Sequence, residues 1–175
     1  MKPIFIIGYM AAGKTTFGRA LAHRLGMQFI DLDFFITQRF HASISEIFSK
    51  YGEDRFRSIE TNILREVGEF DDVIISCGGG TPCHSGNIGY MNSRGITVLL
   101  EASLQRTIER IRLAPGKRPL IAGKSDNELR EYILRHKEDR SPFYNAAQIH
   151  IPSDALESRA QIASTIDAFL PLLHL

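Results

Sequence analysis

Residues 8–15, GYMAAGKT, have the spacing of a Walker A loop. In this motif, four residues separate the first glycine from a Gly-Lys-Thr or Gly-Lys-Ser sequence. Glycines let successive backbone N–H groups point at one phosphate, and the following helix adds the partial positive charge of its amino end. Lys14 would bridge the β- and γ-phosphates of ATP, and the Thr15 hydroxyl would ligate Mg²⁺. This pattern favours a nucleotide site over a glycine-rich turn with a solvated lysine. The residues expected to contact ATP here are Gly8, Ala11, Ala12, Gly13, Lys14, Thr15 and Thr16.

Such a loop needs a strand before it and a helix after it, and the chain supplies both. Short apolar runs rich in β-branched residues and bounded by turn residues are typical of buried strands. These runs are residues 3–7, 28–32, 72–77, 96–100 and 147–151. Helical periodicity lies between them, for example in Phe17, Leu21 and Leu25. The alternation predicts an α/β fold with three layers, in which helices cover both faces of a five-stranded parallel sheet.

Two segments interrupt this alternation. Residues 33–70 form a long helical stretch between the second and third strands, and residues 112–124 are rich in Gly, Pro, Lys and Arg. Ser43 with Glu46, and Ser125 with Glu128, have the spacing of a capping box and predict two further helix starts. Insertions of this kind often carry substrate contacts and lids.

Asp31 and Asp33 end the second predicted strand, which lies beside the Walker A loop if the sheet is doubly wound. Their spacing would place both carboxylates on one side of an extended chain, so that one serves the metal and the other reaches a substrate hydroxyl. Alternatively, Asp33 only caps the following helix. The third strand lacks the terminal aspartate that switch-type and motor NTPases use to bind Mg²⁺. The Asn-Lys-x-Asp motif that recognises guanine does not occur in the sequence. The pattern favours a small-molecule kinase.

The acceptor site is predicted from two arginines and a glycine triplet. Arg57 has Glu60 one helical turn away, so Glu60 could hold its guanidinium, and Arg140 follows the helix that begins near Ser125. Two guanidiniums in one pocket suit a planar carboxylate, although either arginine alone is more often a surface charge. Residues 78–80, GGG, would expose backbone N–H groups and let a ligand approach closely.

In these motifs the chain resembles the shikimate kinases from end to end. The matching features, in the order of that family, are the Walker A loop, DLD at 31–33, FRxxE at 56–60, GGG at 78–80, RPL at 118–120 and RxxxY at 140–144. The resemblance implies a P-loop kinase fold like that of nucleoside-monophosphate kinases. It also implies ATP- and Mg²⁺-dependent phosphorylation of the 3-hydroxyl of shikimate, a step toward chorismate and the aromatic amino acids.

The resemblance also implies roles for single residues. Asp33 would receive the hydroxyl, and the carboxylate and ring of shikimate would be held by Arg57, Arg140 and the backbone of Gly79 and Gly80. The catalytic residues would be Lys14, Asp33 and Arg118.

The remaining implied roles concern the lid, the metal and the adenine. Arg118 would swing in with a lid over about 112–124, and its charge would stabilise the transferring phosphoryl group. Asp31 would act on Mg²⁺, through water. The arginine that packs on adenine would be Arg110 or Arg112, of which the spacing favours Arg110, and residues 152–158 would form the other adenine-side loop.

Composition limits the partners. The 175 residues, 43 % hydrophobic, predict one domain over residues 1–175, with a P-loop core, a substrate-binding insertion at about 33–61 and the lid. The chain has 21 basic and 20 acidic residues, so its net charge is only +1. We therefore expect no nucleic-acid or membrane partner. Cys77 and Cys83 have neither the CxxC spacing of a redox motif nor the spacing of metal ligands, and such cysteine usage fits a reducing cytoplasm best. We also expect a monomer.

Two other functions fit part of the pattern. A kinase acting on gluconate or a nucleoside monophosphate would share the Walker A loop and the lid, but it would not need FRxxE, GGG and RxxxY together. A catalytically silent module that binds such metabolites and regulates a partner would usually have lost the lysine, the aspartates or the lid arginine.

Overall fold

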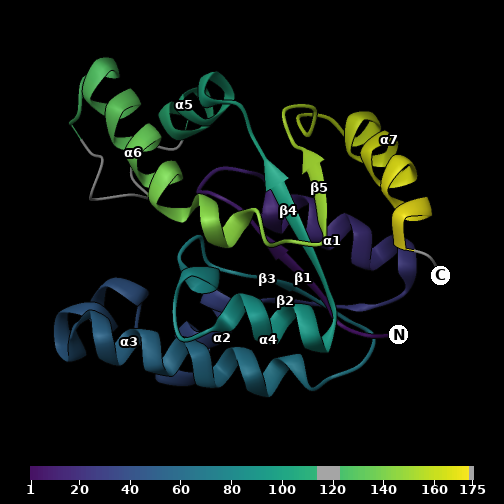
Figure 1. Cartoon of the computed structure of the whole chain (residues 1–175), viewed down its shortest axis with the longest axis horizontal. Coiled ribbons are helices and arrows are strands. Elements are labelled where there is room, and N and C mark those ends of the chain that lie inside the picture. Colours follow the sequence, from purple (N-terminus) through teal and green to yellow (C-terminus); the bar gives the residue numbers. More distant parts are fainter. Residues whose placement is uncertain (114–122, 174–175) are drawn as a thin grey trace.

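The computed structural model describes residues 1–113 and 123–173. Within these residues, the sheet has five parallel strands in the order β2-β3-β1-β4-β5 (Figure 1). The strands are β1 (Ile4–Ile7), β2 (Gln28–Asp31), β3 (Val73–Ser76), β4 (Ile96–Glu101) and β5 (Ile149–Pro152). Each lies where the apolar runs predicted it, so the expected five-stranded parallel sheet is confirmed.

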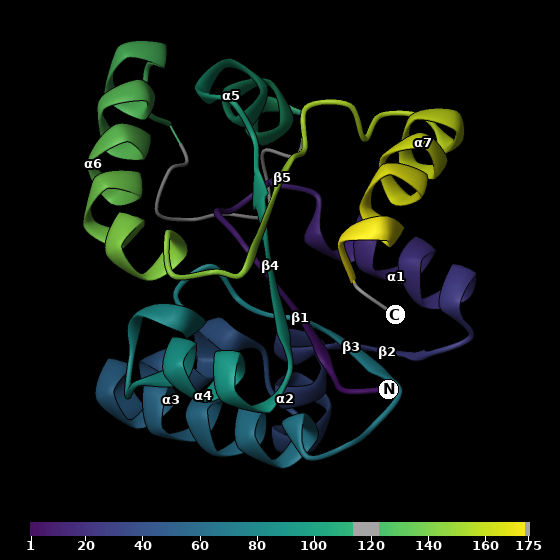
Figure 2. The same ribbon diagram turned by 45° about the vertical axis from the view of Figure 1, so that its right-hand side comes forward.

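Alternating side chains of the central strand β1 serve two separate cores. Phe5 and Ile7 pack in the core beneath α2 to α6, whereas Ile4 and Ile6 pack in the core beneath α1 and α7. Figure 2 shows α1 and α7 to the right of the strands and α3, α4 and α6 to the left. The three-layer prediction is therefore confirmed. The helices are α1 (Lys14–Leu25), α2 (Leu32–Phe40), α3 (Ile44–Gly68), α4 (Asn87–Arg94), α5 (Leu104–Arg112), α6 (Asp126–Tyr144) and α7 (Arg159–Phe169).

The predicted helical segment 33–70 consists of two helices. Ser43 and Glu46 form the expected capping box at the start of α3, and Ser125 and Glu128 form another at the start of α6. Helix α3 has a kink at Gly52, whose φ of 79° and ψ of 169° are not helical. The carboxyl-terminal part of α3, beyond this kink, carries Arg57 and Glu60.

Helix α6 is longer than the sequence predicts. The sequence places Arg140 after this helix, but Arg140 lies inside it because α6 continues through Pro142 to Tyr144. Proline has no N–H to donate to the carbonyl four residues earlier. That carbonyl, of Glu138, instead accepts a hydrogen bond of 2.8 Å from the Ser141 hydroxyl. The helix thus tolerates the proline, and Arg140 has a rigid base.

Short elements complete the architecture. The 3₁₀ helices η1 (Thr81–Cys83) and η4 (Leu170–Leu173) follow the glycine triplet and α7, respectively. In residues 1–113 and 123–173, no helix is both long and apolar enough to cross a membrane. Because the strands are parallel, the segments after β1, β2 and β3 meet at one edge of the sheet, where a ligand of an open α/β sheet is expected.

Candidate functional site

A cleft of about 470 Å³ lies at this edge of the sheet. The Walker A loop forms one side of it and requires glycine at its first position. Gly8 has a φ of 143°, and a Cβ atom there would lie 2.5 Å from the Leu100 carbonyl oxygen. The lining residues are Met10, Ala11, Ala12, Gly13, Lys14, Thr15, Thr16, Asp31, Asp33, Ser76, Cys77, Gly78 and Gly79.

Lys14 is held by the loop that it follows. Its ammonium group donates hydrogen bonds of 2.9 Å to the carbonyl oxygens of Gly8 and Tyr9. Burial lowers the pKa of Lys14 to about 8, although the carboxylate of Asp33 acts in the opposite direction. The lysine therefore remains mostly protonated at neutral pH and presents a poorly hydrated cation in the cleft.

Asp31 joins the Walker A loop to α2. One of its carboxylate oxygens accepts a hydrogen bond of 2.8 Å from the Thr15 hydroxyl, and the other accepts one of 3.2 Å from the Phe34 N–H. Asp31 is thus the N-cap of α2, and the alternative in which Asp33 caps this helix is wrong. The extended chain expected through Asp33 is also wrong, because α2 already begins at Leu32. Both carboxylates nevertheless line the cleft.

Asp33 has the properties of a proton acceptor. Its pKa is raised to about 6, first by burial and then by the carboxylates of Glu60 and Asp31, while Lys14 and Arg57 oppose this rise. A carboxylate with a pKa of about 6 is ionised at neutral pH and still basic enough to take a proton from a hydroxyl as that hydroxyl reacts. The side chain lies close to the cation expected to bind phosphate.

The guanidinium of Arg57 is fixed from several sides. Its Nη1 donates to Glu60 Oε2 at 2.9 Å, as the spacing of the two residues predicts. Its Nη2 donates to Glu53 Oε1 at 3.3 Å, and the rings of Phe48 and Phe56 lie within 6 Å of the guanidinium carbon. Only 1 % of Glu60 is exposed, so this ion pair is largely removed from water.

The glycine triplet is the meeting point of the charged residues. A Cβ atom on Gly80 would lie 2.9 Å from Arg57 Nη2, and one on Gly79 would lie 3.2 Å from Arg140 Nη1. A Cβ atom on Gly78 would lie 3.1 Å from Asp33 Oδ1. The structure thus brings Arg57, Arg140 and Asp33 to three consecutive residues, although these side chains come from different helices.

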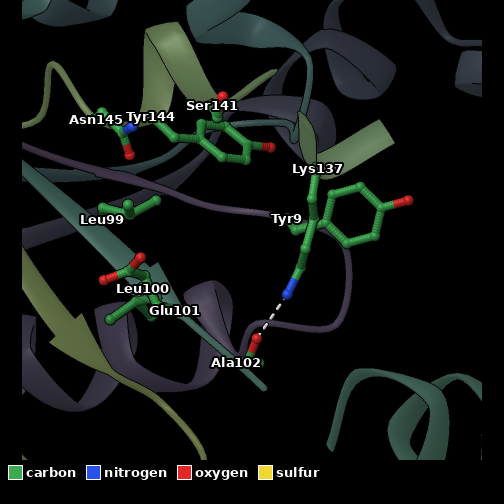
Figure 3. Close-up of a pocket in the computed structure, with 9 residues that line it drawn as sticks. All are labelled: Tyr9, Leu99, Leu100, Glu101, Ala102, Lys137, Ser141, Tyr144 and Asn145. Carbon is green, nitrogen blue, oxygen red and sulfur yellow. Dashed lines mark hydrogen bonds between the residues drawn. The ribbon is translucent and has the colours of Figure 1, made fainter. Parts of the chain in front are cut away.

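Arg140 has two aromatic neighbours that sequence reasoning did not assign to the site. Its guanidinium carbon lies 5.5 Å from the centre of the Tyr9 ring, and Tyr144 donates a hydrogen bond of 2.7 Å to the Gly79 carbonyl oxygen. Figure 3 shows the long side chain of Lys137, one turn earlier on α6, extending beside Tyr9 to the Ala102 carbonyl. The Walker A loop and the triplet are therefore both tied to α6.

Of the two arginines expected near the adenine, Arg110 lies closer to the Walker A loop. It donates to the carbonyl oxygens of Ala11 at 3.1 Å and Ser153 at 2.7 Å, and it pairs with Glu157 at 2.6 Å. Arg112 instead pairs with Asp126. Arg110 thus joins the Walker A loop to the predicted loop 152–158. The predicted catalytic residue Arg118 lies outside the described residues, as does most of the lid expected at 112–124.

The donor set suits Mg²⁺. The Thr15 hydroxyl and the Asp31 carboxylate lie 2.8 Å apart at the cleft, and both are oxygen donors. Among residues 1–113 and 123–173 there is no group of three or more His, Cys, Asp or Glu that could hold a metal. Mg²⁺ does not need such a group, because it usually binds through one or two protein oxygens together with water and substrate phosphates.

A Walker A loop at the edge of a parallel sheet, with a carboxylate in the cleft and two guanidiniums at the adjoining glycine triplet, defines a P-loop small-molecule kinase. Comparison with known proteins is more specific. The model of the shikimate kinase family matches residues 10–171, and the chain belongs to this family. A shikimate kinase from Bacteroides fragilis is 48 % identical over 98 % of this chain and 96 % of its own.

Solved structures agree with this assignment. The crystal structure of shikimate kinase from Bacteroides thetaiotaomicron has a TM-score of 0.95 and 46 % identity, covering 99 % of this chain and 98 % of that one. Shikimate kinase from Acinetobacter baumannii in complex with shikimate has a TM-score of 0.85 and 30 % identity, covering 99 % and 94 %. The resemblance inferred from the motifs, and the fold that it implies, are confirmed.

The raised pKa of Asp33 predicts a stability that depends on pH. Asp33 ionises near its ordinary pKa of 3.8 in the unfolded chain but at about 6 in the folded one, so ionisation costs stability as the pH rises between these values. At pH 8, Asp33→Asn should therefore raise the free energy of unfolding by about 3 kcal/mol. Urea denaturation at pH 4 and pH 8 measures this difference.

The same experiment includes a control. Asp54→Asn removes an exposed carboxylate from α3 and should change the stability little at either pH. The gain in Asp33→Asn should disappear at pH 4, where the wild-type carboxyl is protonated. An equal gain at both pH values would show that relief of buried charge is not its cause.

Proposed function

We propose that this protein transfers the γ-phosphoryl group of ATP to the 3-hydroxyl of shikimate and forms shikimate 3-phosphate. Its membership of the shikimate kinase family supports this proposal, as does the complex of the Acinetobacter baumannii enzyme with shikimate. The reaction is a step toward chorismate and the aromatic amino acids.

The observation that carries this proposal is the meeting of Arg57, Arg140 and Asp33 at the glycine triplet. A cyclic acid with a hydroxyl needs a clamp for its carboxylate and, some distance away, a base for its hydroxyl. Guanidinium groups bind carboxylates through paired, charge-assisted hydrogen bonds. The absence of side chains at Gly79 and Gly80 lets both guanidiniums lie next to the backbone of the triplet.

The chain's own residues act mainly by position and charge. Lys14 and the N–H groups of the Walker A loop hold the β- and γ-phosphates, and Arg57 and Arg140 orient the acceptor so that its hydroxyl faces the γ-phosphorus. Asp33 accepts the proton of that hydroxyl as the new bond forms. Arg118, in the predicted lid, supplies a further positive charge for the transferring group.

Thr15 and Asp31 would hold Mg²⁺, Asp31 through water. When bound, this ion would neutralise phosphate charge. Arg110, which contacts the Walker A loop and residues 153 and 157, is proposed to pack on the adenine. Cys77 and Cys83 are free thiols, and the cytoplasmic location and the monomeric state both stay predictions.

The first test is a panel of acceptors. Purified protein with ATP and Mg²⁺ should release ADP with shikimate, and release little with gluconate, AMP or no acceptor. Release of ADP with another acceptor alone would leave the nucleotide site intact and overturn the acceptor pocket. Tight ATP binding without turnover on any acceptor would favour the regulatory module.

Arg57→Ala tests the carboxylate clamp. Loss of a charge-assisted, partly buried contact should raise the KM for shikimate by about 30-fold or more while changing the KM for ATP little. Arg55→Ala is a matched control, because Arg55 is exposed on the same helix. If Arg57→Ala leaves the KM for shikimate unchanged, Arg57 does not hold the carboxylate.

Asp33 is tested by substitution and by pH. Asp33→Asn should lower kcat by about 10²- to 10⁴-fold, the range for loss of a general base, and leave the Kd for ATP nearly unchanged. In the wild type, kcat/KM for shikimate should fall as the pH drops below about 6, where Asp33 becomes protonated. Loss of ATP binding in Asp33→Asn would instead assign this residue to the metal site.

A further inference from the structure

A chain of buried polar side chains lies behind Arg57. One carboxylate oxygen of Glu60 accepts a hydrogen bond from the Arg57 guanidinium, and the other accepts one of 2.6 Å from the Thr81 hydroxyl. Glu60 is 1 % exposed and Thr81 is 0 % exposed. Each oxygen of this carboxylate therefore has its own donor, one from α3 and one from η1.

Thr81 is itself held by α4. Asn87 is the first residue of that helix. Its side-chain amide donates a hydrogen bond of 2.9 Å to the Thr81 carbonyl oxygen and one of 3.1 Å to the Thr61 hydroxyl. Asn87 is 0 % exposed. The amide thus bridges η1 and α3, and it limits the positions that the Thr81 hydroxyl can take relative to Glu60.

Gly78 lies beside the contact between Thr81 and Glu60. A Cβ atom on Gly78 would lie 3.1 Å from the Thr81 hydroxyl and 3.2 Å from Glu60 Oε1. The hydroxyl holds this oxygen beside Gly78, and the Arg57 guanidinium contacts the other oxygen, Oε2. Without that donor, the carboxylate could turn and give both oxygens to the guanidinium, which would rotate Arg57 away from Gly80.

We propose that Thr81 is a positioning residue for the acceptor: its hydroxyl orients Glu60, and Glu60 orients the Arg57 guanidinium toward the carboxylate of the substrate. Asn87 supports this arrangement by holding Thr81. The proposal rests on the proposed function, because Arg57 is taken as the carboxylate clamp. It makes binding of the acceptor depend on a hydroxyl group that touches neither substrate.

The test is Thr81→Val, which removes the hydroxyl and nearly keeps the side-chain volume. The KM for shikimate should rise about tenfold, as expected for loss of one buried hydrogen bond to a charged group, and the KM for ATP should stay unchanged. Thr81→Ser restores a hydroxyl and should restore the KM for shikimate. In a Glu60→Gln background, Thr81→Val should add little, because the hydroxyl acts through the Glu60 carboxylate.

The control is Thr97→Val. Thr97 is also 0 % exposed and hydrogen-bonded, but it lies near the amino end of β4. This variant should lose stability without a change in the KM for shikimate. If Thr81→Val does not fold, Thr81→Ala and Thr81→Ser provide the same comparison, because only Thr81→Ser retains the hydroxyl.

The outcomes separate the two proposals. If the wild-type protein releases no ADP with shikimate, the proposed function fails and the role of Thr81 fails with it. If the wild type turns over shikimate and Thr81→Val keeps the wild-type KM, only the positioning role is overturned. Equal rises in the KM for shikimate and the KM for ATP would also overturn it, because a general loosening of the fold would then be the cause.

Discussion

The buried carboxylate of Glu60 is the constraint on which the acceptor side of the structure depends. A carboxylate removed from water is costly unless both oxygens have donors. Arg57 and Thr81 supply these donors, so α3 and η1 must pack closely, and a side chain at position 78 would crowd this contact. The stability of this region and the orientation of the Arg57 guanidinium therefore depend on the same hydrogen bonds.

The same crowding of charge affects the reaction. Burial raises the pKa of Asp33 most, the carboxylates of Glu60 and Asp31 raise it further, and Lys14 and Arg57 limit that rise. A cluster of this kind costs stability, but it leaves Asp33 ionised yet basic at neutral pH, beside the cation expected to bind the phosphates. The parallel sheet makes the cluster possible, because it brings the segments after three strands to one edge, and the rest of the fold offsets the cost.

Features set by local spacing could be predicted from the sequence. The Walker A loop, the pairing of Arg57 with Glu60, the capping boxes and the five strands depend on residues close together in the chain. Predictions failed where a neighbouring group decided the conformation, as at Asp33, which lies on a helix because Asp31 caps it, and at Arg140, which lies inside α6 because Ser141 compensates for Pro142. The contact of Thr81 with Glu60 joins residues 21 positions apart, and no local spacing indicates it.

The function proposed for this site depends on recognition of the acceptor carboxylate by Arg57. Calorimetric titration of shikimate and of its methyl ester into the wild-type protein and Arg57→Ala tests this claim most directly, because the ester removes the charge and keeps the ring. We expect the wild type to prefer shikimate strongly and Arg57→Ala to reduce this preference by about tenfold or more. The same preference in both proteins would contradict it, because the carboxylate would then be recognised without Arg57.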